Sequence, residues 1–165
     1  MNIDKKTGLV HEWTVICRSS SIDKESGALS IFNVADNIKV NKKHFEEHIS
    51  KDGEKERPFI IPAEFEIISM WSKSNPDFLS LEVKTEVFDP FSESLFRFSY
   101  NVSLKEGRQK SRNRSKIKGF KVTGAGLYTV NLSVRKDEGE EYRSIARTAI
   151  DVALSEPKEG GSKVS

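Results

Sequence analysis

The sequence has 165 residues, of which 36% are hydrophobic and 32% are charged, and its formal net charge at pH 7 is +2. A chain of this size can bury roughly two-thirds of the surface that its unfolded form exposes, so we expect one domain that folds without a metal or disulfide. The small net charge excludes a strong attraction of the whole molecule for nucleic acid or acidic lipid. No run approaches the roughly 20 apolar residues of a membrane-spanning helix, so we expect no membrane association.

Cysteine usage and the first residues predict the cellular compartment. Cys17 is the only cysteine, so no disulfide can form within the chain. Residues 1–6 contain no apolar run of the kind found in a signal peptide. We therefore expect a protein that is kept in the reducing cytoplasm.

Alternating apolar and polar residues predict β-strands, because a period of two places successive side chains on opposite faces of a strand. The first strand has Trp13, Val15 and Cys17 in its inward row, with His11 at the surface just before it. In that row the Cys17 thiol packs as a small apolar group and does not act as a nucleophile. A second strand covers 28–34.

The segment after the second strand predicts one short helix over 41–53. Asn41 is suited to cap the helix N-terminus, and Gly53 lies near its C-terminus. Phe45 and Ile49 are four residues apart, so both lie on the face that would pack on the sheets. The helix is expected to form a small lid.

The third strand starts near Ala63 and continues to about Trp71, because the preceding Pro62 cannot donate a hydrogen bond to a neighbouring strand. A β-hairpin follows, in which 79–87 pairs with 96–104. The turn between them contains a proline at a position where its fixed φ angle favours a type I turn.

A second hairpin joins 128–134 to 146–154 through the polar, glycine-containing connection 136–141. A weaker strand lies at about 117–122, which brings the number of predicted strands to eight. Amphipathic strands of this kind bury their apolar faces best as two packed sheets.

We therefore predict an all-β fold: a two-sheet antiparallel β-sandwich of about eight strands, immunoglobulin-like or C2-like, with one short helix in a loop. A closed barrel is the alternative architecture. The sandwich is expected to form a single domain over 1–154. Residues 155–165 have little apolar surface to bury, so we expect a flexible C-terminal tail there.

Four short sequence motifs can be compared with those of known protein families. They are Ile16-Cys17-Arg18, the block 27–34, the turn Asp89-Pro90 and the motif 126–132. Together they resemble a family of uncharacterised bacterial proteins, a domain of unknown function built as a β-sandwich. The resemblance covers most of 10–154 and departs from the family pattern between Lys39 and Arg57 and after Leu104. That family has no assigned activity, so the resemblance implies the fold and no substrate.

Basic residues recur at every second position from 110 to 118, and further basic residues lie on both sides. In an extended chain, alternate residues share one face at a spacing of roughly 7 Å. Such a row could follow a phosphate backbone or an acidic protein surface. The candidate binding residues are Lys105, Arg108, Lys110, Arg112, Arg114, Lys116, Lys118 and Lys121.

The same row has a structural interpretation, because exposed edge strands carry lysine to prevent sheets from pairing with one another. Phe120 is the one aromatic residue of the segment that could stack on a base, whereas single-strand binders use several. The solvated edge is the favoured interpretation, and a binding role of the row is the strongest functional hypothesis.

Residues 44–48 match the H-x-x-E-H pattern of certain zinc proteases. In a helix, His44, Glu47 and His48 would lie on one side and could hold zinc. The pattern needs a long helix and a third ligand, whereas this charged segment permits about three turns. We expect a solvated helix without metal or other cofactor, and a zinc-dependent hydrolase stays as a remote alternative.

No nucleophile elbow or phosphate-binding loop is present, since Gly124-Ala125-Gly126 precedes a strand and not a helix. The favoured hypothesis is a non-enzymatic binding or assembly module that acts through loops and the basic edge. Its partner would be another protein or a second copy of the chain, joined by strand pairing. The alternative is a nucleic-acid-binding accessory protein that uses the basic segment 105–121.

Overall fold

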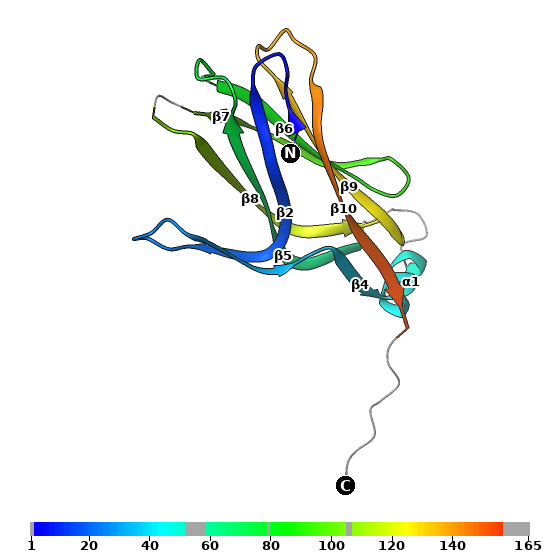
Figure 1. The fold of residues 1–165 in the computed structure, drawn as a ribbon. Coiled ribbons are helices and arrows are strands. Elements are labelled where there is room, and N and C mark those ends of the chain that lie inside the picture. Colours follow the sequence, from blue (N-terminus) through cyan, green and yellow to red (C-terminus); the bar gives the residue numbers. More distant parts are fainter. Residues whose placement is uncertain (1, 52–58, 79, 105–106, 157–165) are drawn as a thin grey trace.

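The computed structural model describes residues 2–51, 59–78, 80–104 and 107–156. Its elements in chain order are β1 (Asn2–Ile3), β2 (Leu9–Ile22), β3 (Leu29–Val34), β4 (Asn37–Asn41), α1 (Lys42–Lys51), β5 (Phe59–Lys73), β6 (Ser80–Phe88), β7 (Ser94–Ser103), β8 (Lys110–Val122), β9 (Gly126–Arg135) and β10 (Arg143–Ser155). The strands form two sheets that pack face to face (Figure 1). The predicted all-β sandwich with one short helix is confirmed.

Each sheet contains five strands among the described residues. Sheet A has the order β1-β2-β5-β8, and β3 pairs with the C-terminal part of β2. Sheet B has the order β4-β10-β9-β6-β7. The two predicted hairpins are confirmed as the antiparallel pairs β6–β7 and β9–β10. The sheets are not wholly antiparallel, because β4 runs parallel to β10. The chain leaves sheet A after β3 and joins an edge of sheet B with β4, a crossover that permits a parallel pair.

The core lies between the sheets and is formed by alternate residues of the long strands. Its largest fully buried side chains include Trp71 and Phe65 from β5, Phe120 from β8 and Tyr128 from β9. The ring of Phe120 lies 5.6 Å from that of Phe65 and 5.3 Å from that of Tyr128. Because burial of one large apolar side chain contributes roughly 1.5–3 kcal/mol, the interface between the sheets is the main source of stability.

The inward row predicted for β2 is wrong. His11 and Ile16 lie on the face toward sheet B, whereas Cys17 lies on the opposite face of sheet A. A register shift just after His11 changes the alternation by one residue, as a β-bulge does. His11 is 7% exposed and not at the surface as expected, and its ring packs edge-on against Trp71 at 5.1 Å.

A second bulge lies between β5 and β8. Pro62 and Ala63 in β5 and Gly119 in β8 have no partner in the register of the two strands. Gly119 has a φ of +77°, and a Cβ there would lie 2.7 Å from Cγ2 of Ile60, so this position requires glycine. The strand was predicted to start near Ala63, but it starts at Phe59 and accommodates the proline within the bulge.

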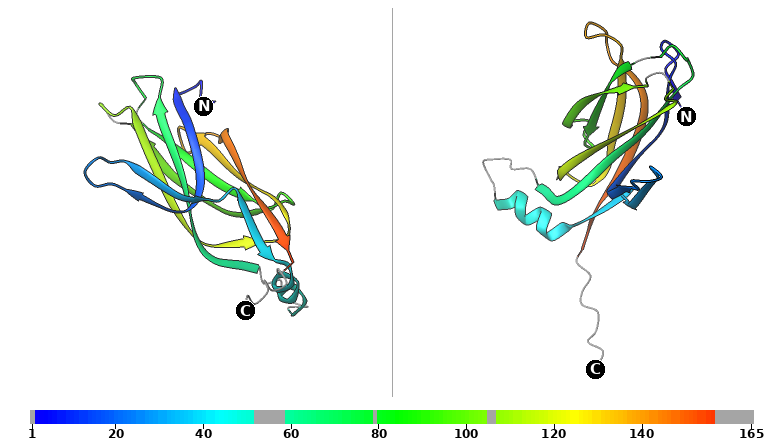
Figure 2. Two further views of the ribbon diagram at one scale, coloured as in Figure 1. Left: turned by 60° about the horizontal axis from the view of Figure 1, so that its bottom comes forward. Right: turned by 90° about the vertical axis from the view of Figure 1, so that its left-hand side faces the viewer.

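The helix α1 lies at one end of the sandwich, beside β4 and the start of β5 (Figures 1 and 2). Oδ1 of Asn41 accepts a hydrogen bond from the backbone N–H of His44 at 3.2 Å, which confirms the predicted N-cap. Phe45 is buried and packs edge-on against Phe59, with ring centroids 5.5 Å apart. Ile49 is 56% exposed, contrary to the prediction, because the helix extends past the end of the sheets. The predicted C-cap Gly53 lies outside the described residues.

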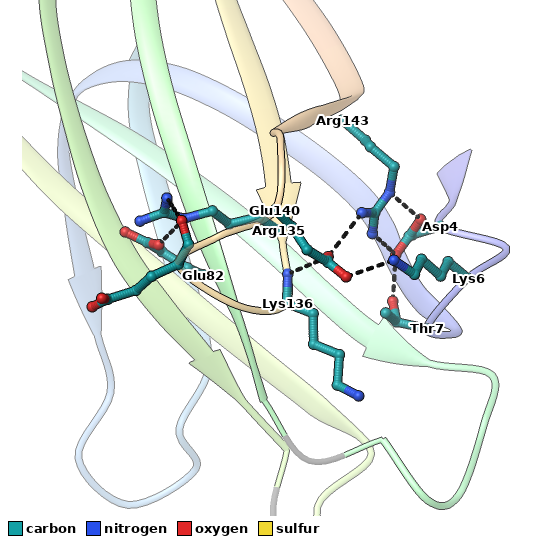
Figure 3. Close-up of polar contacts among 9 residues, drawn as sticks. Asp4, Lys6, Thr7, Glu82, Arg135, Lys136, Glu140 and Arg143 are labelled. Carbon is teal, nitrogen blue, oxygen red and sulfur yellow. Dashed lines mark hydrogen bonds and ion pairs between the residues drawn. The ribbon is translucent and has the colours of Figure 1, made fainter.

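Ion pairs join two turns at the other end of the sandwich (Figure 3). Nη2 of Arg143 lies 3.0 Å from Oδ2 of Asp4, and Nζ of Lys6 lies 2.6 Å from Oε1 of Glu140. These contacts connect the β1–β2 turn to the β9–β10 region. Such pairs near the surface contribute less than about 1 kcal/mol each, so their main effect is to hold the turns in place.

The first two residues of the predicted C-terminal tail, Ser155 and Glu156, contact the rest of the protein. Ser155 belongs to β10, and a carboxylate oxygen of Glu156 lies 3.1 Å from Nζ of Lys42. The remaining residues 157–165 lie outside the described part of the chain. Within that part, no helix has the length and apolar character needed to cross a membrane.

Candidate functional site

The row of basic residues predicted from the sequence lies along β8, on the face of sheet A that points away from sheet B. The register with β5 places Lys116 opposite Glu66, and Lys118 opposite Glu64, on that outer face. The bulge at Gly119 changes the alternation, so Lys121 joins the same face although its number is odd. The described row therefore consists of Lys110, Arg112, Arg114, Lys116, Lys118 and Lys121. Arg108 is exposed before the strand, and Lys105 lies outside the described residues.

The central cations of the row contact the β2–β3 hairpin. Nη2 of Arg112 donates to the carbonyl of Gly27 at 3.2 Å, and Nη1 of Arg114 donates to Oγ of Ser20 at 3.3 Å. Ser20 also donates to Glu66, whose second carboxylate oxygen lies 3.8 Å from Nζ of Lys116. These contacts give the middle of the row a structural role that spacing in the sequence could not indicate.

The hairpin contacts accompany unexpected burial on the outer face of sheet A. Cys17 and Ile68 have no exposed surface there, and Glu66 is 4% exposed. Burial raises the pKa of the Cys17 thiol, and the nearby Glu66 carboxylate raises it further. The thiol is therefore protonated at neutral pH, which favours the packing role over a nucleophilic one.

A groove of about 340 Å³ lies beside the lysine end of the row, between β7 and β8. Phe96 and Phe98 of β7 and Ile117 of β8 form its apolar part, and all three are half-buried. Its basic part consists of Lys116, Lys118 and Lys121, and Ile60 and Gly119 complete the lining. An apolar groove with several cations on one side can accept a ligand that carries both apolar groups and negative charge.

The aromatic part of this groove was missed in the sequence. Phe120 was the candidate stacking residue, but it is 2% exposed and belongs to the core. The rings beside the lysines come from β7, in the other sheet, about twenty residues earlier in the chain. Alternation in 96–104 predicted an inward row but not which neighbour that row would meet.

Both strands that border the groove are edge strands. Among the described residues, β8 pairs with β5 alone and β7 pairs with β6 alone. Figure 1 shows the two strands on the same side of the sandwich, one from each sheet. The backbone of an edge strand has hydrogen-bonding groups that no neighbouring strand satisfies.

The helical residues of the H-x-x-E-H pattern make contacts within the protein. Glu47 lies 3.9 Å from Nζ of Lys43, and the ring of His48 packs edge-on against Phe59 at 5.6 Å. The backbone N–H of His44 is engaged by the N-cap. Across the described ranges, no three His, Cys, Asp or Glu side chains are grouped so that they could hold a metal ion.

Comparison with known proteins finds a similar structure but no similar sequence. No protein family model matches the sequence, and no curated protein sequence matches it. Among solved structures, the chain is similar to the crystal structure of the C-terminal domain of wzt, with a TM-score of 0.45 and 10% sequence identity. The similarity covers 94% of this chain and 84% of that one. The comparisons therefore assign neither a family nor a binding function.

Proposed function

We propose that this protein is a non-enzymatic binding module that recognises an extended acidic segment of a partner protein at the β7–β8 groove. The observation that supports the proposal is the presence of several lysines and the two half-buried rings of Phe96 and Phe98 in one groove. In an extended partner segment, alternate residues point in opposite directions. Carboxylates at one set of positions would meet Lys118 and Lys121, while apolar side chains at the other set would enter the groove.

The edge position of β8 supports the same proposal. A partner segment could add to the unpaired edge and gain main-chain hydrogen bonds, which supply affinity in many peptide-binding domains. The neighbouring side-chain groove would then supply specificity. Lysines on an edge strand prevent pairing with basic or neutral strands but attract an acidic one, so a single feature serves both purposes.

Nucleic acid is the second candidate, favoured by the exposed Lys110 and Lys118 on one face of β8. We place it second because bases stack on open ring faces, whereas Phe96 and Phe98 are half-buried. The hydrogen bond of Arg112 to the hairpin also leaves this side chain fewer donors for phosphates.

A second copy of this chain is the other protein partner to consider. Among the described strands β3 pairs with β2 alone, and it exposes Phe32 and Val34 by 49% and 58%. A homodimer through β3 would explain those apolar side chains. It would not explain the lysines of β8, because two copies of that basic edge would repel each other. Light scattering over a range of protein concentrations would detect it.

The test is a fluorescence-anisotropy titration with a labelled peptide of alternating glutamate and valine, at low and at physiological salt. The site variant is Lys118→Glu/Lys121→Glu. The control variant is Lys24→Glu/Lys39→Glu, which changes the charge equally at two exposed lysines away from the groove. We expect the site variant to weaken peptide binding by about tenfold or more, corresponding to about 1.4 kcal/mol, and the control to change it little.

Two outcomes would contradict the proposal. Equal losses in the site and control variants would show that net charge, and not the groove, attracts the peptide. Binding of a single-stranded oligonucleotide in preference to the peptide would favour the nucleic-acid candidate, with affinity that falls steeply as salt rises.

A further inference from the structure

A second hollow lies on the opposite side of the molecule from the basic row, on the face of sheet B that points away from sheet A. Its volume is about 560 Å³, and it spans β6, β9, β10 and the turn after β6. The cross-strand register places Phe88, Thr129 and Ala149 in one row across its floor. The next row contains Asn131 and Arg147.

The rim of this hollow is fixed by hydrogen bonds between two turns. Oδ1 of Asp89 accepts from the backbone N–H groups of Phe91 and Glu93 at 2.9 and 2.8 Å, and Oδ2 accepts from Oγ1 of Thr123 at 2.8 Å. The hydroxyl of Tyr128 donates to the carbonyl of Gly124 at 2.9 Å. The two motifs Asp89-Pro90 and 126–132, noted separately in the sequence, therefore meet here.

The rim is also tightly packed. Gly126 has a φ of +135°, and a Cβ at that position would lie 2.9 Å from Cβ of Pro90. The close approach requires glycine. A preformed rim of this kind lowers the ordering cost that a ligand would otherwise have to offset.

Two charged residues line the hollow, Arg147 and Asp89. The Asp89 carboxylate is buried and accepts the hydrogen bonds of the rim, so Arg147 is the group available to a ligand. Its Nη2 donates to Oγ1 of Thr129 at 2.9 Å, which directs the side chain across the floor. Among the described residues Arg147 makes no ion pair. Glu86, which shares its row through Asn131, already lies 3.2 Å from Nζ of Lys84 and accepts from Oγ of Ser94 at 2.9 Å. The remaining guanidinium N–H groups can therefore meet an anion.

Asn131 adds a polar position beside the arginine. Its Oδ1 is buried and has no hydrogen-bond partner in the described part of the chain. Asn131 is half-buried and lines the hollow, so the end of its amide that faces the hollow is within reach of a ligand. The two ends look alike and can be exchanged by a half-turn, so that end can donate to an anion held by Arg147 or accept from a ligand. A buried polar group without a partner is uncommon, so Asn131 is the least satisfied polar side chain along this row.

The other wall is apolar. Leu127 is 61% exposed at the end of the hollow, and Phe88, Pro90 and Ala149 lie along it. An apolar wall that faces an arginine and an amide has the composition of a small-molecule site. A guanidinium can bind a planar carboxylate through two parallel hydrogen bonds.

We propose that this hollow binds a small organic carboxylate with an apolar, ring-sized body. The carboxylate would pair with Arg147, and the body would cover Ala149 between Phe88 and Leu127. This site is independent of the proposed peptide groove, because it lies on the outer face of the other sheet and shares none of its lining residues.

The experiment is an NMR titration of the ¹⁵N-labelled protein with benzoate, alongside the neutral analogue benzamide. We expect benzoate to shift the amide signals of 127–131 and 147–149 and to bind about tenfold more tightly than benzamide. Arg147→Gln should abolish that preference. Ala149→Leu, at an exposed position that tolerates a larger side chain, should block both compounds.

Lys24→Gln is the matched control, since it removes one positive charge at an exposed position far from the hollow and should leave the titration unchanged. Equal affinity for benzoate and benzamide, or equal losses in Arg147→Gln and Lys24→Gln, would overturn the proposal. A peptide with a C-terminal phenylalanine is a further arm. If it binds more tightly than benzoate, and if amidation of its terminus removes the difference, a terminal carboxylate and not a free acid is the ligand.

Discussion

The two faces of sheet A are both covered, but by different means. The face toward sheet B buries Phe65 and Trp71 in continuous contact with the apolar core. The outer face buries Cys17 and Ile68, and there Arg112 joins the β2–β3 hairpin to β8 by a hydrogen bond. Burial on the inner face depends on a large apolar contact area. Burial on the outer face depends on a few polar contacts, which single substitutions can remove.

The largest effect on stability is expected at Gly119, because its bulge decides which residues of β8 point to which face of sheet A. Gly119→Val would place a β-branched residue at a φ of +77°, with its Cβ 2.7 Å from Ile60. We expect a loss of about 2–3 kcal/mol in the free energy of unfolding, measured by urea denaturation.

The control for this substitution is Gly139→Val, because a Cβ at Gly139 meets no atom within 4 Å. It should change the free energy of unfolding by less than about 0.5 kcal/mol. Similar losses in the two variants would show that the bulge is not specially constrained.

Removal of the two arginines should open the outer face and leave the inner one intact. For Arg112→Ala/Arg114→Ala we expect a loss of about 1–2 kcal/mol, because each arginine hydrogen-bonds the hairpin. The specific signal is Cys17, whose buried thiol should react with a disulfide reagent about tenfold faster or more once the hairpin opens.

Lys118→Ala/Lys121→Ala is the matched pair for that experiment, since it removes two cations from the same strand that make no ion pair among the described residues. Its stability and thiol reactivity should stay close to those of the wild type. An unchanged reaction rate of Cys17 in the arginine variant would mean that the hairpin does not protect the outer face.

The smallest expected effect is a pH dependence of stability that comes from His11 on the inner face. Burial lowers the pKa of His11 below its usual value of 6.5. The unfolded chain therefore binds the proton more readily than the folded one between the two pKa values, so stability falls as pH decreases below about 6.5. The slope should not exceed about 1.4 kcal/mol per pH unit.

His11→Gln should flatten this dependence, because glutamine does not titrate and can still hydrogen-bond Thr14, which lies 2.8 Å from Nε2 of His11. Urea denaturation at several pH values between 5 and 8 would measure the difference. If wild type and variant lose stability in parallel, another group is responsible for the pH dependence.

Much of the fold could be predicted because the strands are amphipathic. Leu81 and Val83 in β6, and Val130 and Leu132 in β9, alternate with polar residues and all four are buried. Period-two counting failed where a bulge shifts the alternation, as it does after His11. Gly119, inside a predicted strand, was the available signal for one such bulge.

The candidate site, too, could be predicted from the sequence only in part. The sequence determined that cations recur along one strand, because alternate residues of any extended chain share a face. Tertiary structure decided what each cation meets: Arg112 and Arg114 meet a hairpin, and Lys118 and Lys121 border a groove whose rings belong to the other sheet. Local spacing fixes the direction of a side chain, but its neighbours come from segments distant in sequence, and only packing of the two sheets brings them together.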